Sequence, residues 1–391
     1  MSQSSSVSLR YCLLILLLSI SCEKNSSKWP TAGWPESTPA AQGMDLEKLS
    51  SMDEEFASGK HGYIDGMLVI RNGYVVYSNK YDQDYEAPFR NTNTEPGQYN
   101  YYDPAWHPFY KGTQLHSMQS ISKSVTSAIV GIAIAQGIIP DVNVKISSYL
   151  GDFSTPDLDH RRENMTLEDV LTMRTGIKWD ESTIPYTDPA NSCAGMEQSQ
   201  DWIQFVVSQP MASNPGDIFV YNSGATMLLS EMIRKATGLE VDEFGQKYLF
   251  EPLGISEYYW KRTPRGLTDT EGGLYLKPED LAKIGYLFLK DGIWEGRRIL
   301  PEGWVKESVT PRVELTSSKT RYGYKWWLLP YKEGKYAITG LGYGGQRLII
   351  VPEKELIAVF TGWNIYDKPS LNANYVLKNL LQAFNSESYP L

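Results

Sequence analysis

The chain has 391 residues, of which 41% are hydrophobic and 21% charged, and its formal net charge is −9. This is the composition of a globular protein large enough for a sizeable core, which excludes a disordered or collagen-like chain. The negative charge and the lack of a basic run argue against nucleic acid as a partner. Three cysteines and four histidines, none in a metal-binding spacing, predict neither a disulfide framework nor a metal centre.

The N-terminus has the features of a secretory signal. Arg10 precedes the apolar run Tyr11–Ile20, which is shorter than the roughly 18 residues that a transmembrane helix needs. The step before Cys22 resembles a bacterial lipobox, in which the cysteine becomes the lipidated first residue, although Ser19 stands where leucine is usual. Residues 1–21 are therefore predicted to be a signal peptide and Cys22 a lipidation site, with ordinary secretion as the alternative.

A linker is predicted to follow the signal. Residues 22–42 are rich in Ser, Thr, Pro and Ala, a composition typical of a flexible, lipid-anchored linker with little structure of its own. The protein is accordingly expected to cross the inner membrane and to remain anchored to a membrane, in the periplasm or at the cell surface. The folded domain is expected to occupy residues 43–391.

The first part of the domain predicts a helix and a hairpin. In residues 44–58 apolar side chains recur at helical spacing, and Gly59 follows them. Asn72-Gly73 stands between two β-rich runs, which is the strongest short hairpin signal. Residues 82–116 then form a long, polar segment rich in aromatic residues, for which we expect a loop that contributes a rim or lid to a pocket.

The middle of the chain is predicted to be helical. Ile121, Val125, Ile129 and Ile132 mark one face of a helix closed by Gly137, and the second half of this helix is apolar all round, as in a central buried helix. Further helices are predicted from their capping residues at 166–176, 223–236 and 278–290.

The C-terminal part returns to strands. The runs 348–351 and 356–360, joined by a longer turn, predict a second hairpin, and residues 372–386 predict a final helix. The order of strands, helices, strands and helix predicts an α+β fold. Its antiparallel sheet would be built from N- and C-terminal strands and flanked by helices, with the helical middle as a large insertion.

One pair of residues suggests nucleophilic chemistry. The chain has no GxSxG elbow, no Walker A loop and no GxGxxG motif, so neither an α/β-hydrolase site nor a cofactor is predicted. Ser120 and Lys123 stand three apart at the start of the predicted central helix and therefore share one face, as a nucleophile and its base must. Because burial disfavours the charged form of an amine, we expect the pKa of Lys123 to be lowered, which would let it accept the serine proton.

Two further motifs accompany this pair. Tyr221-Asn222-Ser223 follows the sequence PGDIFV, and Gly340–Gln346 (GLGYGGQ) precedes the second hairpin. Together with Ser120–Lys123 they resemble the serine β-lactamase and penicillin-binding-protein superfamily, in particular its class C-like branch of esterases, D-amino-acid peptidases and nylon-oligomer hydrolases. The resemblance covers roughly residues 44–386 and implies a β-lactamase/transpeptidase-like version of the predicted fold.

The resemblance implies a role for each motif. Ser120 would be the acylated nucleophile, Lys123 its proton acceptor, and Tyr221 the acid/base that serves first the leaving group and then water. The backbone N–H groups of Ser120 and Tyr343 would form the oxyanion hole. The candidates for substrate binding are Ser223, Gly342 and Trp179.

Two departures from the family pattern bear on the substrate. Ser223 stands where the family usually has asparagine, and Gly340-Leu341-Gly342 lacks the lysine and threonine that engage a substrate carboxylate in the family. The resemblance therefore implies a serine hydrolase that cleaves a small-molecule ester or amide through an acyl-enzyme. The alternatives are a β-lactamase or D-alanyl-D-alanine carboxypeptidase, and a non-catalytic lipoprotein with the same fold. Nothing in the sequence indicates the oligomeric state.

Overall fold

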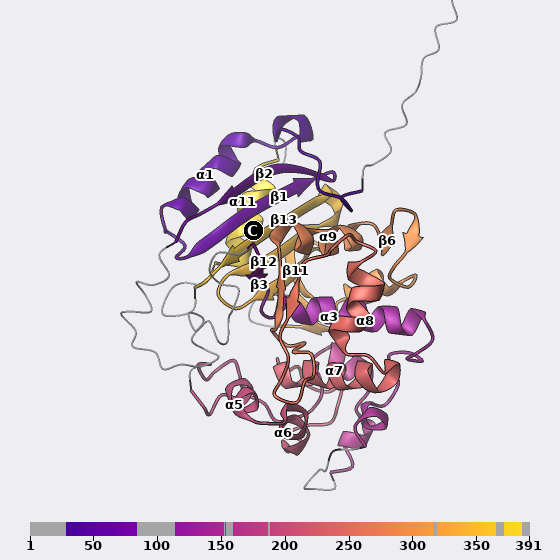
Figure 1. Ribbon diagram of the computed structural model, residues 1–391. Helices are drawn as coiled ribbons and strands as arrows, with labels where there is room; N and C mark the ends of the chain where they lie inside the picture. Colours follow the sequence, from indigo (N-terminus) through magenta and orange to yellow (C-terminus); the bar gives the residue numbers. More distant parts are fainter. Residues whose placement is uncertain are drawn as a thin grey trace, which may run out of the picture.

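The structure is a computed structural model that describes residues 29–83, 114–151, 153, 159–186, 188–315, 319–364 and 371–384 (Figure 1). The predicted signal peptide, the lipidation site Cys22 and most of the aromatic segment 82–116 lie outside these residues. No helix in the described ranges is both long and apolar enough to cross a membrane.

An antiparallel sheet of eight strands forms the centre of the described fold (Figure 1). From one edge to the other the strands are β2 (Tyr74–Lys80), β1 (Ile64–Arg71), β13 (Leu356–Gly362), β12 (Gln346–Val351), β11 (Lys335–Gly342), β10 (Trp327–Lys332), β9 (Arg321–Tyr322) and β8 (Val313–Glu314). Because β1 pairs with β13, the first strands of the chain lie beside the last. This confirms the predicted α+β fold, with a sheet built from both ends of the chain.

Both predicted hairpins are present. Strands β1 and β2 are joined by Asn72 and Gly73, whose φ angles of 53° and 81° are those of a type I′ turn, which favours Asn-Gly for this reason. Strands β12 and β13 are joined by a 3₁₀ turn, η5 (Pro352–Lys354), and by Glu355 at φ 45°.

Helices cover both faces of the sheet. On one face lie α1 (Leu46–Ala57) and α11 (Ala373–Gln382), which pack with Ile349 and Val351 of β12. On the other face lie α3 (Ile121–Ala135) and α9 (Pro278–Leu289), which pack with Leu348 and Ile350 of the same strand. Alternate residues of the strand thus enter two separate cores, as the pleat of a strand requires.

The helical insertion lies beside the α3 side of the sheet (Figure 1). Its helices are α4 (Leu167–Leu171), α5 (Ser192–Gln198), α6 (Trp202–Ser208), α7 (Ser223–Thr237), α8 (Val241–Gly245), the π-helical turn η4 (Gln246–Phe250) and α10 (Trp304–Ser308). Short 3₁₀ helices are η1 (Ala40–Gln42), η2 (Ile146–Tyr149) and η3 (Arg162–Asn164). Two small sheets complete the fold, β3 (His116–Ser117) with β5 (Leu274–Leu276) and β4 (Tyr259–Trp260), and β6 (Ile293–Trp294) with β7 (Arg297–Arg298).

One helix is shorter than its sequence predicts. Thr166 forms the predicted capping box with Asp169, but α4 ends at Leu171 instead of continuing to Gly176. Met173 has φ 59°, a left-handed conformation that a helix cannot continue through. The chain turns there and carries the residues before Gly176 toward the segment that precedes α7, where Val220 N–H donates to the Met173 carbonyl.

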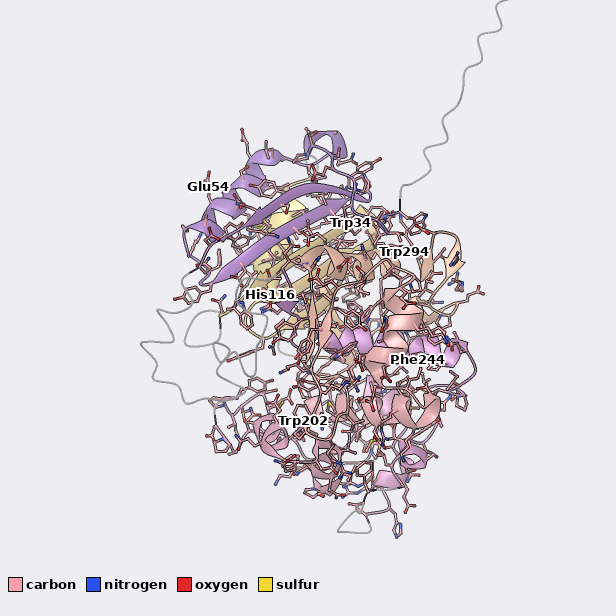
Figure 2. The ribbon with its side chains drawn as sticks, in the orientation of Figure 1. Trp34, Glu54, His116, Trp202, Phe244 and Trp294 are labelled. Atoms are coloured by element: carbon pink, nitrogen blue, oxygen red, sulfur yellow. The ribbon has the colours of Figure 1, made fainter. Side chains whose placement is uncertain are left out.

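The predicted linker is structured from residue 29 onward, so the prediction of a flexible tether is wrong for residues 29–42. Trp29 and Trp34 pack edge-on against Tyr286 of α9, at ring distances of 5.6 and 5.5 Å. The Trp34 ring also donates to the Glu279 carbonyl, and Trp294 donates to the Thr31 hydroxyl at 2.8 Å. Trp34 and Trp294 are labelled in Figure 2. The prediction rested on the polar composition of the segment and did not take into account that its two tryptophans would pack against apolar side chains of the domain.

Close packing fixes the central helix against its neighbours. Gly131 of α3 lies against the Trp304 ring, and a Cβ there would come within 2.5 Å of a ring carbon. A side chain at this position would therefore push α3 and the tryptophan apart.

We expect Gly131→Ala to destabilise the protein by about 1–3 kcal/mol, because overpacking exceeds the gain in helix propensity. The midpoint of urea unfolding measures this effect. Gly151→Ala is the control, since nothing lies within 4 Å of a Cβ at that position. Equal midpoints for both variants would contradict the proposed tight contact.

Candidate active site

Ser120 lies at a sharp turn at the N-terminal end of α3. Gln119 just before it has φ 49°, a conformation that costs energy for a residue with a side chain. The turn is fixed because Met118 N–H donates to the Leu274 carbonyl at 2.8 Å, beside the pairing of β3 with β5. Met118 and Ile121 are fully buried, whereas Ser120 keeps part of its surface exposed. The turn therefore presents the Ser120 hydroxyl from a rigid base.

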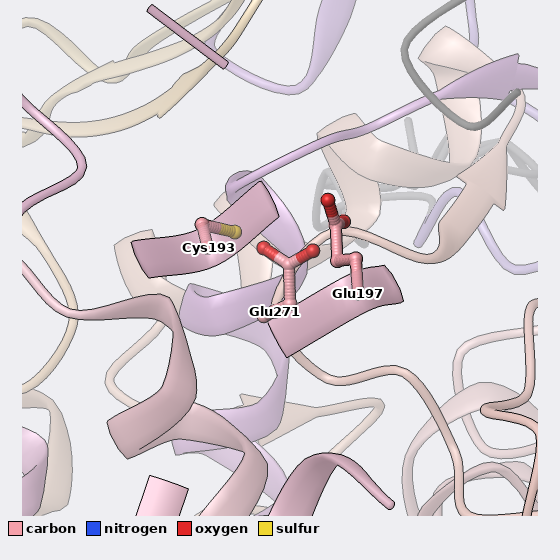
Figure 3. Close-up of side chains that lie close together, drawn as sticks. All are labelled: Cys193, Glu197 and Glu271. Atoms are coloured by element: carbon pink, nitrogen blue, oxygen red, sulfur yellow. The ribbon is translucent and has the colours of Figure 1, made fainter. Parts of the chain in front are cut away.

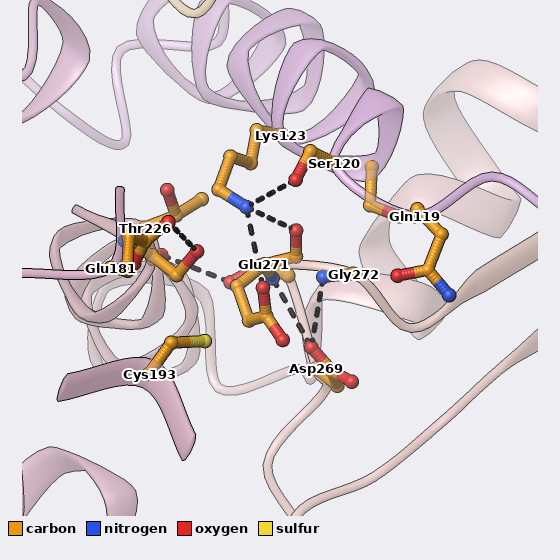
Figure 4. A network of polar contacts seen from close by, with 12 residues as sticks. Gln119, Ser120, Lys123, Glu181, Cys193, Thr226, Asp269, Glu271 and Gly272 are labelled. Atoms are coloured by element: carbon orange, nitrogen blue, oxygen red, sulfur yellow. Dashed lines mark hydrogen bonds and ion pairs between the residues drawn. The ribbon is translucent and has the colours of Figure 1, made fainter. Parts of the chain in front are cut away.

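Lys123 meets Ser120 as the spacing predicts. Its ammonium nitrogen lies 3.0 Å from Ser120 Oγ (Figure 4). The same nitrogen donates to the backbone carbonyl of Glu271 at 2.6 Å and lies 3.3 Å from Glu271 Oε2. Only 1% of the lysine is exposed to solvent. Three oxygens thus surround a fully buried amine.

The pKa of Lys123 is shifted in the direction opposite to that predicted from the sequence. Burial disfavours the ammonium, as expected, but attraction by the surrounding acidic groups, among them the Glu271 carboxylate in contact with it, outweighs burial and raises the pKa of Lys123 above the ordinary lysine value. The prediction considered only desolvation and missed the nearby carboxylates. In the resting state Lys123 is therefore an ammonium group.

Tyr221 completes the group around the nucleophile. Its hydroxyl is hydrogen-bonded to Ser120, and the Lys123 nitrogen lies 5.3 Å from the centre of its ring. The ring stacks on Trp327 at 5.6 Å, with 28° between the planes. Burial raises the pKa of Tyr221, and the charge of Lys123 opposes this rise. The structure thus brings together all three predicted catalytic residues, from α3 and from the segment that precedes α7.

The end of β11 approaches the nucleophile's turn. A Cβ on Gly342 would lie 2.5 Å from the Met118 carbonyl oxygen, so only glycine allows this contact between the two backbones. Gly340 likewise lies against Ile121. Tyr343 follows directly and is 38% exposed. Gly342 therefore allows the end of β11 to approach the backbone of the Ser120 turn closely. The backbone of Tyr343, the next residue, lies at this end of the strand.

Two predicted substrate-binding residues face inward instead. The Ser223 hydroxyl and backbone N–H donate to Glu181 at 2.9 and 2.8 Å, and the Trp179 ring donates to the same carboxylate at 2.6 Å. Both residues are buried, and the structure gives each of them an internal partner; their assignment to substrate contact stays a prediction. Their partner Glu181 also accepts from the Tyr186 hydroxyl at 3.3 Å. Four donors around one buried carboxylate fix the start of α7, directly after Tyr221.

A second cluster of acidic side chains lies beneath Lys123. Cys193 and Glu197 stand on one face of α5, and with Glu271 each offers a ligand-type atom within 4.8 Å of the others (Figure 3). This set is of a kind that could bind a metal ion. However, Glu271 already faces the Lys123 ammonium, and burial raises the pKa of the Cys193 thiol well above its usual value, which keeps it protonated. Within the described residues, the cluster forms an ion pair with Lys123, whose nitrogen lies 3.3 Å from Glu271 Oε2.

The carboxyl groups of this cluster do not all carry charge. Glu197 and Glu271 are hydrogen-bonded to each other; burial raises the pKa of Glu197 well above its usual value, whereas the pKa of Glu271 is lowered because Lys123 outweighs the effect of burial. Burial also raises the pKa of Asp269 to about 6. Asp269 accepts from the backbone N–H groups of Glu271 and Gly272 at 3.2 and 3.1 Å, and this holds the turn that carries Glu271 (Figure 4).

The arrangement can support acyl transfer. A hydroxyl at a helix start contacts both an ammonium and a phenol, and the N-terminal end of α3 is positively polarised. Sequence reasoning found these three residues but missed Glu181, Glu197 and Glu271. Only the four-residue spacing of Cys193 and Glu197 on one helix gave a local signal for the cluster.

Comparisons with known proteins agree with this site. A family model described as Beta-lactamase matches residues 60–365. The 6-aminohexanoate-dimer hydrolase of Paenarthrobacter ureafaciens is 25% identical over 266 residues, which are 62% of this chain and 65% of that protein. The match thus spans slightly less than two-thirds of that curated relative's length.

Solved structures share the fold. EstCE1, described as a hydrolase with promiscuous acyltransferase activity, has a TM-score of 0.65 and 15% identity, and the match covers 89% of this chain and 100% of that one. The octameric penicillin-binding protein homologue from Pyrococcus abyssi has a TM-score of 0.60 and 20% identity, with 89% and 80% covered. At these low sequence identities, the structural similarity shows that the fold is shared.

Proposed function

The chain belongs to the beta-lactamase family, and from this premise we propose that it is a serine hydrolase that cleaves a small-molecule ester or amide through an acyl-enzyme. The observation that supports this proposal is the contact of Ser120 Oγ with both Lys123 Nζ, at 3.0 Å, and the Tyr221 hydroxyl. A protein that only binds ligands needs no such set, so the geometry favours catalysis over the non-catalytic alternative.

The proposed reaction has two stages. Ser120 Oγ attacks the carbonyl carbon while its proton passes to the Lys123–Tyr221 pair, and the carbonyl oxygen becomes an oxyanion. The pair returns the proton to the leaving alcohol or amine as its bond to the carbonyl breaks. A water molecule then attacks the acyl-enzyme by the same route, releasing the acid and restoring the serine.

The oxyanion requires donors that are already in place. We assign the backbone N–H groups of Ser120 and Tyr343 to this role. The assignment is supported by the close approach of the β11 end to the Ser120 turn, where Gly342 leaves no space for a side chain. Removal of a single oxyanion donor typically lowers the rate by about 10²–10³-fold, so each of the two assigned N–H groups would account for a large part of the rate enhancement.

The substrate class follows from what the β11 motif lacks. Gly340, Leu341 and Gly342 bring no cationic or hydroxyl side chain to the site, so a substrate carboxylate finds no partner among these three residues. This favours an uncharged ester or amide over a β-lactam or a D-alanyl-D-alanine peptide.

We also retain the proposal that Cys22 is lipidated and anchors the domain to a membrane. It is supported by the apolar run before the cysteine in the sequence. Metabolic labelling with a lipid precursor tests it, and undiminished labelling of a Cys22→Ala variant would contradict it.

The proposed activity is tested by turnover of p-nitrophenyl esters, short amides, a D-alanyl-D-alanine peptide and nitrocefin. We expect hydrolysis of esters or amides, with nitrocefin and the peptide cleaved far more slowly. Faster cleavage of nitrocefin than of any ester or amide would make the β-lactamase alternative the better one. Lack of turnover of every compound would contradict the proposal.

A further inference from the structure

The charge on Lys123 depends on two acidic residues to which the family resemblance assigns no role. Glu271 contacts the lysine twice, through its backbone carbonyl at 2.6 Å and its carboxylate at 3.3 Å. The second acid, Glu197, lies close to that carboxylate on α5 (Figure 3), and a side-chain hydrogen bond between the two is among the causes that raise the pKa of Glu197. Both carboxyl groups are buried, which makes their protonation states decisive for the lysine.

The surroundings of Glu197 indicate that it is neutral. One of its carboxyl oxygens, Oε2, is buried without a hydrogen-bond partner in the part of the chain that the structure describes. An ionised oxygen in such a place would be strongly destabilising, whereas a neutral carboxyl group tolerates it. Glu197 can then donate its proton to Glu271, which leaves Glu271 as the ionised member of the pair.

We propose that the ionised Glu271, held by the neutral carboxyl group of Glu197, is a positioning residue that keeps a proton on Lys123 and so sets the pH at which Ser120 becomes reactive. The inference rests on the proposed hydrolase function. It names a residue that acts through Lys123 and touches neither the substrate nor the reacting atoms.

The proton count explains the effect on reactivity. In the resting state Lys123 is an ammonium and Tyr221 a neutral phenol, so neither of the two groups that contact Ser120 can yet accept its proton. One proton must leave the pair to solvent before Ser120 can attack. Because Glu271 favours the proton on Lys123, the proton that leaves is that of Tyr221. The phenolate oxygen then accepts the Ser120 proton and later gives it to the leaving group, whose bond to the carbonyl breaks.

Other charged groups surround this pair and contribute to its titration. Those that face Lys123, besides Glu271, are Tyr221, Glu181, Cys193 and Lys325. Those that face Glu271, besides Lys123, are Glu197, Lys261, Asp269, Cys193 and Glu181. Of these, Glu271 is the carboxylate in contact with the ammonium.

The direction of the pH dependence follows from these contacts. The pKa of Lys123 and that of Tyr221 are both raised, so each group holds its proton more tightly than it would in water. The reactive form, which has lost one proton, therefore becomes more populated as the pH rises. The value of kcat/KM of the wild type is expected to increase into the alkaline range.

The test is the pH profile of kcat/KM for a p-nitrophenyl ester. Glu271→Gln removes the negative charge beside Lys123, so the pair loses its proton more easily. The acid limb of the profile is expected to move to lower pH by about 1–2 units, the size of shift that a neighbouring charge produces. A reduced amount of folded protein lowers the whole curve but does not move the limb, so the position of the limb reports the charge.

Three further variants sharpen the test. Glu271→Asp keeps the negative charge but places it farther from Lys123, because the side chain is shorter. The acid limb of its pH profile is expected to lie between those of the wild type and Glu271→Gln. Glu197→Gln exchanges one neutral donor for another and is expected to move the limb much less than Glu271→Gln. Glu231→Gln is the matched control, because Glu231 is a fully buried carboxylate that pairs with Arg234 at 2.7 Å, away from the candidate site. Its limb is expected at the wild-type position.

The outcomes separate this inference from the proposed function. An acid limb that stays in place or rises in Glu271→Gln, in an active wild type, would overturn the role of Glu271 and leave the hydrolase proposal intact. A shift in Glu197→Gln as large as that in Glu271→Gln would show that Glu197 is the charged member and overturn the assignment. A wild type without any hydrolysis would overturn the proposed function itself.

Discussion

Replacement of Ser120 by alanine is expected to lower kcat/KM for an activated ester by at least about 10⁴-fold, because no other hydroxyl contacts both Lys123 and Tyr221 among the described residues. Without Oγ no acyl-enzyme can form, and any remaining rate would come from the oxyanion donors acting on bound water. Initial rates of p-nitrophenyl ester hydrolysis at one alkaline pH measure the effect.

The matched control for this variant is Ser127→Ala. Ser127 lies on the same helix and is fully buried, and its hydroxyl has no hydrogen-bond partner in the described structure. Its removal should therefore leave the rate within a factor of about two, as for a substitution away from the reacting groups. Equal rates for Ser120→Ala and the wild type would mean that hydrolysis uses another group.

The second large effect is expected for Tyr221→Phe. This change removes the hydroxyl that contacts Ser120 but keeps the ring stacked on Trp327, so the fold should not change. Loss of a general acid/base typically costs about 10²–10⁴-fold, and we expect kcat to fall within this range. Steady-state kinetics over a range of pH measures it, and the alkaline rise of the profile should weaken as the titrating phenol is lost.

Tyr331→Phe serves as the control for the loss of a tyrosine hydroxyl. Tyr331 lies in β10, and its hydroxyl donates to Glu353 at 3.2 Å, which is not part of the candidate site. Activity close to that of the wild type is expected for this variant. A Tyr221→Phe enzyme with unchanged kcat would remove the phenol from the mechanism and leave Lys123 as the proton acceptor.

The elements that the sequence predicts well are those that depend on neighbouring residues. The Asn72-Gly73 turn, the Thr166 capping box and the spacing of Ser120 and Lys123 are local patterns, and each is present in the structure. The helix predicted at 223–236 is likewise present as α7, and Gly238 ends it in a left-handed conformation. Such features need no knowledge of the tertiary fold.

What the sequence does not predict depends on contacts between distant segments. Glu271 lies 148 residues after Lys123, and Glu181 lies 42 residues before Ser223, so no local spacing connects either pair. For the same reason desolvation alone gave the wrong direction for the pKa of Lys123. The side chains of Ser223 and Trp179 turn inward because a buried carboxylate needs donors, a need that appears only once the fold is known.

The central claim is that Lys123 and Tyr221 make the Ser120 oxygen the nucleophile. The most direct test is peptide mapping by mass spectrometry after incubation with a fluorophosphonate probe that reacts with activated serines. We expect one covalent adduct, on the peptide that contains Ser120, and much slower formation of it in Tyr221→Phe. An adduct confined to another residue, or an active wild type that remains unlabelled at Ser120, would contradict the account.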